Sequence, residues 1–134
     1  MADGSQLAVL WFTRGESNKP QVNLSRSKDN GNTFESPLVI EAEDNLGRVA
    51  GTYLKDGSTL VAWMRIVSDD KVSLLIRRIQ KNGDMGKPIE LATLKNSRGT
   101  GFPTIAGYGN EAIISWTDFE QNTIRTVLVH TTPD

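Results

Sequence analysis

The chain has 134 residues, of which 37% are hydrophobic and 23% are charged, an ordinary composition for one globular domain with its own core. Fifteen basic and sixteen acidic residues give a formal net charge of −1, which argues against a nucleic-acid-binding surface. The absence of cysteine and the single histidine exclude disulfides, thiol catalysis and zinc sites built from Cys or several His. We therefore expect no cofactor and no metal, with calcium held by oxygen ligands alone left open.

The amino terminus carries no recognisable targeting signal. Residues 1–6 are acidic rather than basic, and the apolar run over residues 7–12 is too short for a signal-peptide core. No segment is long enough to cross a membrane. The sequence thus predicts a soluble protein without a signal peptide, and leaves its location unknown.

Short apolar strands separated by turn signals follow one another along the whole chain. Three tryptophans show the period, because Trp11, Trp63 and Trp116 lie 52 and 53 residues apart and each ends an apolar strand that follows a glycine turn. The expected strands cover residues 6–11, 21–26, 38–40, 49–54, 59–63, 72–79, 89–92, 104–106, 112–116 and 122–129. They divide one domain, residues 1–134, into repeats of roughly 1–45, 46–97 and 98–134.

Repeats of about 40–50 residues with four short strands each are typical of β-propeller blades. The alternative is a β-sandwich in which three similar strands arise by chance. Because turn, tryptophan and following strand recur together, the pattern favours the propeller. We expect an all-β chain of antiparallel four-stranded blades, with two and a half to three blades present.

The most specific stretch is a polar turn between two expected strands, residues 27–34. Its short side-chain acceptors and its glycine suit a tight reversal, and its aromatic residue is expected to bury beneath the turn. The pattern S-x-D-x-G-x-T-F is carried by Ser27, Asp29, Gly31, Thr33 and Phe34. It resembles the Asp-box of sialidase-like, or BNR-repeat, β-propellers. In that family the Asp-box is structural and lies away from the ligand, so we expect the same role here.

The resemblance covers nearly the whole chain and corresponds to the carboxy-terminal half of six-bladed sialidase-like proteins, whose members are exported. The ten expected strands cannot close a ring, and the first inner strand is expected to lie before Met1. Open sheet edges and half-covered blades are an aggregation hazard. The chain is therefore expected to be either a fragment of a longer propeller or a homo-oligomer in which two half-propellers form one ring.

In propellers of this family, ligands bind on the face that is opposite the Asp-boxes. Five charged residues are expected near that face because they follow the tryptophan strands or precede the inner strands: Arg14, Arg48, Arg65, Arg98 and Asp118. Converging guanidinium groups bind carboxylates, which indicates an anionic glycan or a protein as the ligand. Solvated loop charges with no ligand are the alternative.

The catalytic residues of sialidases are not recognisable. The arginine-isoleucine-proline motif is absent, and neither Tyr53 nor Tyr108 has a glutamate that its spacing places beside it. His130 lacks a nucleophile in a recognisable context. The sequence predicts a non-catalytic module that binds a glycan or protein, and assigns no catalytic residue. The alternative is a fragment of a sialidase-like glycoside hydrolase that lacks part of its catalytic set.

Overall fold

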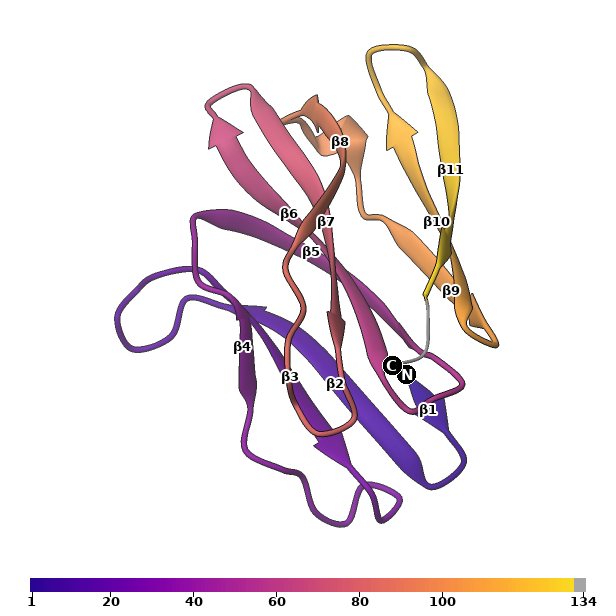
Figure 1. Cartoon of the computed structure of the whole chain (residues 1–134). Helices are drawn as coiled ribbons and strands as arrows, with labels where there is room; N and C mark the ends of the chain where they lie inside the picture. The colour runs from indigo at the N-terminus through magenta and orange to yellow at the C-terminus, as the bar shows by residue number, and fades with distance from the viewer. Residues whose placement is uncertain (132–134) are drawn as a thin grey trace.

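The computed structural model describes residues 1–131, and in this range the chain forms three antiparallel sheets (Figure 1). The first sheet, blade 1, contains β1 (Ala2–Asp3), β2 (Gln6–Thr13), β3 (Gln21–Ser27) and β4 (Leu38–Glu41). Blade 2 contains β5 (Asn45–Tyr53), β6 (Thr59–Ser68), β7 (Lys71–Ile79) and β8 (Ile89–Lys95). Blade 3 contains β9 (Thr104–Tyr108), β10 (Glu111–Asp118) and β11 (Thr123–His130), and a 3-10 turn, η1 (Arg98–Thr100), precedes it.

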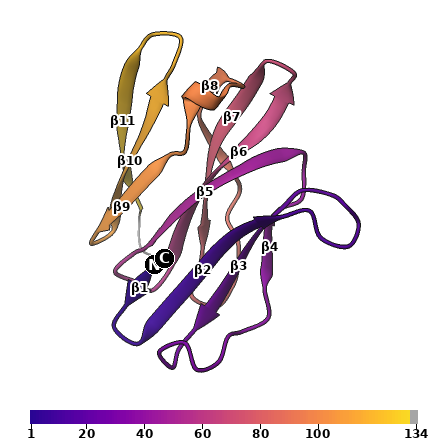
Figure 2. The ribbon, with the colours of Figure 1, turned by 180° about the vertical axis from the view of Figure 1, so that it is seen from behind.

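Strands within each sheet follow chain order, so every sheet is an antiparallel meander like a propeller blade. Blade 2 lies between the other two, which is visible from both sides of the molecule (Figures 1 and 2). The predicted all-β fold with two and a half to three blades is confirmed. Residues 132–134 of the third repeat lie outside the described range.

The prediction that the first inner strand lies before Met1 is wrong. Gly4 has φ +60°, a conformation that suits glycine, and the chain turns there so that Ala2 pairs with Leu7. The amino group of Met1 also donates to the carbonyl oxygen of Ala8 at 3.1 Å. The inner strand β1 is therefore present as a strand of two residues.

Alternate residues of each central strand face opposite neighbours, as the twofold period of a strand requires. In β6, Val61 and Trp63 belong to the buried cluster shared with blade 1, whereas Leu60 and Met64 belong to the cluster shared with blade 3. Trp116 is also buried, at 7% exposure, in the second of these clusters. The apolar core of the chain thus lies in two layers, one between each pair of adjacent blades.

Adjacent blades approach each other closely at β5 and β9, where two glycines make room. A β-carbon on Gly51 of β5 would lie 2.4 Å from Leu10 Cδ1 of β2. A β-carbon on Gly107 of β9 would lie 2.7 Å from the carbonyl oxygen of Tyr53. A backbone oxygen cannot move aside as the end of a leucine side chain can, so Gly107 sets the spacing of blades 2 and 3, whereas Gly51 leaves room for Leu10.

A buried arginine crosses from blade 1 to blade 2. Arg26 of β3 is only 6% exposed. One terminal nitrogen donates to the carbonyl oxygens of Gln80 at 2.8 Å and Lys81 at 3.3 Å. The other donates to Thr59 Oγ1 at 2.8 Å and to the Ile79 carbonyl at 3.0 Å. Arg26 therefore satisfies the backbone at the end of β7 from the neighbouring sheet, and its burial lowers its pKa.

Replacing Arg26 with methionine should lower the free energy of unfolding by about 3 kcal/mol, because buried carbonyl acceptors lose their donors at a cost of roughly 1–3 kcal/mol each. Equilibrium unfolding in urea, followed by tryptophan fluorescence, measures this loss. The matched control is Lys28→Met, which removes an ion pair to Glu35 whose side chains are 64% and 50% exposed. Such surface pairs contribute about 0–1 kcal/mol. Equal effects from the two substitutions would contradict the cross-blade role of Arg26.

Candidate functional site

The two ends of the blades carry different connections, which we name the loop rim and the turn rim. The loop rim consists of the β2–β3, β6–β7 and β10–β11 loops and the β4–β5 and β8–β9 connections (Figure 1). The turn rim holds the inner hairpin turns and the longer β3–β4 and β7–β8 turns. Strand order brings the five predicted ligand-binding residues to the loop rim, and the turn of residues 27–34 lies on the turn rim.

The turn that connects β3 and β4 is closed by its own side chains. Ser27 Oγ donates to Asp29 Oδ1 at 2.8 Å and accepts from the backbone nitrogen of Gly31 at 2.9 Å. The backbone nitrogen of Thr33 donates to Asp29 Oδ1 at 2.9 Å, and the Thr33 hydroxyl donates to Asp29 Oδ2 at 2.6 Å. These hydrogen bonds, led by that of the Thr33 hydroxyl, lower the pKa of Asp29 to about 2. The polar groups are thus occupied within the turn.

The expectation that Phe34 buries beneath the turn is wrong, because its side chain is 48% exposed. Leu7 of β2 lies under the turn instead, with its Cδ1 atom 3.1 Å from the position that a β-carbon on Gly31 would take. The aliphatic side chain already occupies the space beneath the glycine. Phe34 consequently remains on the surface of the turn rim.

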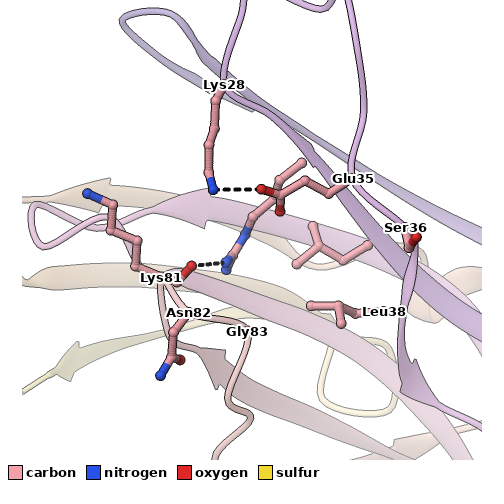
Figure 3. Close-up of a pocket in the computed structure, with 9 residues that line it drawn as sticks. Lys28, Glu35, Ser36, Leu38, Lys81, Asn82 and Gly83 are labelled. Atoms are coloured by element: carbon pink, nitrogen blue, oxygen red, sulfur yellow. Dashed lines mark hydrogen bonds and ion pairs between the residues drawn. The ribbon is translucent and has the colours of Figure 1, made fainter.

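A polar pocket of about 180 Å³ lies between the outer turns of blades 1 and 2 (Figure 3). Lys28 extends beside it to Glu35, with Nζ 2.7 Å from Oε1. Arg26 contributes to its lining through the contacts that hold the end of β7. Of these charged groups, Arg26 reaches across the joint between the blades, whereas Lys28 and Glu35 pair within the β3–β4 turn of blade 1.

The guanidinium of Arg65 is paired with a buried carboxylate. Its Nε and Nη2 atoms donate to the two carboxylate oxygens of Glu41 at 3.1 and 2.7 Å. The Glu41 side chain is 3% exposed, and its hydrogen bond raises the pKa of Arg65. Since Glu41 ends β4 of blade 1 and Arg65 belongs to blade 2, this bidentate pair joins the two blades at the loop rim.

Arg48 is engaged with the backbone of the β8–β9 connection. Its Nη1 atom donates to the carbonyl oxygens of Ser97 at 3.1 Å and Gly101 at 3.2 Å, on either side of η1. Arg48 itself has φ +52°, next to Gly47 at φ +68°, at an irregular start of β5. In addition, the Thr100 hydroxyl donates to the Lys95 carbonyl at 2.6 Å. These contacts fix the conformation of η1.

Asp118 is held within its own hairpin. Arg125 Nε donates to Asp118 Oδ2 at 2.9 Å, and the backbone nitrogen of Gln121 donates to Oδ1 at 3.1 Å. The Arg125 hydrogen bond, aided by that of Gln121, lowers the pKa of Asp118. The carboxylate therefore shapes the β10–β11 loop.

Arg14 and Arg98 differ from the other predicted residues, because neither guanidinium makes a hydrogen bond or ion pair within residues 1–131 and both residues are exposed. Arg98 begins η1, the segment that Arg48 fixes. Of the five residues, Arg98 therefore combines a guanidinium that has no partner in the described residues with a backbone that Arg48 holds in place.

Two exposed aromatic residues that the sequence analysis did not assign lie on the same part of the loop rim. Phe102 is 67% exposed and follows η1 closely, and Phe119 is 52% exposed in the β10–β11 loop. A β-carbon on Gly99 would lie 2.3 Å from the Phe119 ring, so that ring packs on the bare backbone beside Arg98. The signal available in the sequence was an aromatic residue closing the glycine-rich segment 98–102.

The prediction that no glutamate lies beside either tyrosine is wrong. Glu111 of β10 lies directly opposite Tyr108 of β9 in the strand register. The β9–β10 turn is short enough to bring them opposite one another. Glu111 pairs with His130 Nδ1 at 2.8 Å, and Tyr108 is 87% exposed on the turn rim. Tyr53, in contrast, is buried, and burial raises the pKa of its hydroxyl.

Within residues 1–131, no group of three or more His, Asp or Glu side chains is arranged to hold a metal ion. No helix in this range is long and apolar enough to span a membrane.

Comparison with known proteins assigns no family to the chain. No protein-family model matches it, and no curated protein matches it significantly.

The hydrogen bonds to Asp29 predict a specific pH dependence. Because its folded-state pKa of about 2 lies below the ordinary value, ionised Asp29 stabilises the fold fully above about pH 4. That contribution is lost as the pH falls toward 2. Asp29→Asn should therefore destabilise the protein at neutral pH, with a difference from wild type that shrinks between pH 4 and pH 2.

Urea unfolding at a series of pH values measures this difference. The control is Asp69→Asn, whose carboxylate makes no hydrogen bond within residues 1–131 and which should match wild type throughout. A loss that stays constant down to the lowest pH would show that the Asp29 charge is not the source of the stability.

Proposed function

We propose that the chain is a non-catalytic, sialidase-like propeller module that binds an anionic glycan or an acidic protein partner at its loop rim. The observation that carries this proposal is Arg98, an exposed guanidinium with no partner in residues 1–131, beside the exposed ring of Phe119. Charged surface loops are common, but a cation on a backbone segment fixed from a neighbouring strand is preorganised for binding.

The rigidity of the segment comes from three separate contacts. Arg48 binds the carbonyl oxygens on both sides of η1, and the buried Thr100 hydroxyl binds the end of β8. The Phe119 ring packs on Gly99 from the β10–β11 loop of blade 3. A ligand at Arg98 therefore meets a group whose backbone has little freedom left to lose.

The side chains at this position suit a sugar acid. A guanidinium binds a carboxylate through two parallel hydrogen bonds, and this selects anions. An exposed aromatic ring offers an apolar face for the C–H surface of a pyranose. Arg98 with Phe102 and Phe119 combines both properties, which favours an anionic glycan over a simple anion.

Most of the predicted ligand-binding residues support the rim in this proposal and do not contact the ligand. Arg48 becomes a positioning residue, because its donors are used on the β8–β9 connection. Arg65 is neutralised by Glu41 and Asp118 is paired with Arg125, so both support the rim. Arg14 remains a predicted contact for a ligand large enough to reach from blade 3 to blade 1.

The absence of a sialidase catalytic set in the sequence supports a binding role. The full Asp-box pattern of residues 27–34 supports the sialidase-like assignment. Self-association, which would close the ring from two half-propellers, belongs to the same proposal and is supported by exposed apolar residues on the outer faces of blades 1 and 3.

Sialyllactose should bind to the wild-type protein, and neutral lactose should bind at least about tenfold more weakly, because charged hydrogen bonds contribute about 1.5–3 kcal/mol. Arg98→Ala, Phe102→Ala and Phe119→Ala should each lower the affinity for sialyllactose roughly tenfold. Isothermal titration calorimetry gives these affinities.

Matched controls are Lys87→Ala and Phe34→Ala, which remove an exposed cation and an exposed aromatic ring from the turn rim and should leave binding unchanged. Equal affinity for the charged and neutral sugars would contradict the role of Arg98. Turnover of a fluorogenic sialoside that Arg98→Ala abolishes would overturn the non-catalytic assignment and favour the hydrolase fragment.

A further inference from the structure

Blades 1 and 3 each have one face that nothing in residues 1–131 covers. On blade 1, Val9 of β2 is 46% exposed and Val39 of β4 is 43% exposed. On blade 3, Ile113 of β10 is 50% exposed and its cross-strand partner Leu128 is 48% exposed. Apolar side chains in the middle of sheets are normally covered, so these faces indicate an interaction surface.

The two joints inside the chain bring together the same two positions of neighbouring blades. The position three residues before each tryptophan faces the next blade, and the position two residues before it faces the preceding blade. At the first joint Ala8 and Val61 share one buried cluster, and at the second joint Leu60 and Ile114 share the other. The same two positions thus pack at both joints.

Each of the two positions occurs once more on an outer blade, where no neighbouring blade of the described chain packs against it. Ile113 faces forward from blade 3 like Ala8 and Leu60, and Val9 faces backward from blade 1 like Val61 and Ile114. The tryptophans agree, because Trp63 and Trp116 are buried in the two joints whereas Trp11, on the face of Val9, is only partly buried. The exposed face of blade 1 therefore carries the position that would pack against Ile113, and the exposed face of blade 3 carries the position that would pack against Val9.

Several polar groups on the two faces are paired within residues 1–131. On blade 3, Glu111 is paired with His130 at 2.8 Å, and the hydroxyls of Ser115 and Thr126 are hydrogen-bonded to one another at 2.8 Å. On blade 1, the Ser25 hydroxyl beside Val9 donates to the Glu35 carbonyl at 2.6 Å. These groups can therefore keep their hydrogen-bond partners when an apolar partner covers them.

We propose that the Val9 face of blade 1 packs against the Ile113 face of blade 3 in a second copy of this chain. A two-fold axis makes this contact twice, so that each copy supplies both halves of the joint. The inference rests on the proposed self-association and adds which surfaces meet. A second copy is the favoured occupant because the two faces repeat the joints that already exist within one chain.

Charge substitutions at the two unpaired positions provide the test. Val9→Glu and Ile113→Lys each place a charge on an exposed position, so folding is retained, and each should raise the dimer dissociation constant roughly tenfold or more. An equimolar mixture of the two variants should recover dimer. In the mixed pair, one contact joins the introduced carboxylate to the introduced ammonium group, and the other contact keeps the native residues. Sedimentation velocity measures these states, and far-ultraviolet circular dichroism checks folding.

The control is Val67→Glu, an apolar residue that is 57% exposed at the loop rim and should leave the dimer unchanged. A wild-type dimer that survives both charge substitutions would overturn the assignment of these faces while leaving self-association intact. Single variants that dissociate, but whose mixture stays monomeric, would overturn the pairing of blade 1 with blade 3. A wild-type chain that is monomeric up to sub-millimolar concentration would overturn both self-association and this interface.

Discussion

The structure depends on one constraint, which is that each blade has apolar side chains on both faces and has to be covered on both. A sheet in solution commonly buries one face and exposes the other. Blade 2 instead contributes Trp63 to one core layer and Met64 to the other, with both residues fully buried. Stacking of blades is the arrangement that satisfies such strands, and the inner glycines permit the close approach that it needs.

Several arginine side chains join the blades to one another and are not free on the surface. Arg26 satisfies backbone carbonyls across the first joint, Arg65 closes the same joint at the loop rim through Glu41, and Arg48 fixes the connection into blade 3. A guanidinium suits this work because its planar donors reach several acceptors at once. The consequence for function is that few of the rim arginines are left to meet a ligand.

Much of the fold could be predicted from the sequence, because strand periodicity, turn glycines and the spacing of the tryptophans are local patterns. The residues of β6 that face opposite blades, for instance, follow from the alternation around Trp63. The candidate site was less predictable because it depends on partners distant in the chain. Nothing near Arg65 in the sequence indicates Glu41, and nothing near Gly99 indicates that Phe119 packs on it. The short β1 strand was missed because two residues carry no periodicity.

Because the three blades are not covered equally, they also differ in how readily they unfold locally. The two buried clusters of the described residues each join blades that are neighbours in sequence, so local stability depends on how many neighbours a blade has. The central strands of blade 2 are covered on both faces, and their backbone amides are expected to exchange with solvent only when the whole chain unfolds. The edge strand β11, which pairs on one side alone in the described sheet, belongs to the part that opens first. Any partner that covers the outer blades would bring the free energies of local unfolding of the three blades closer together.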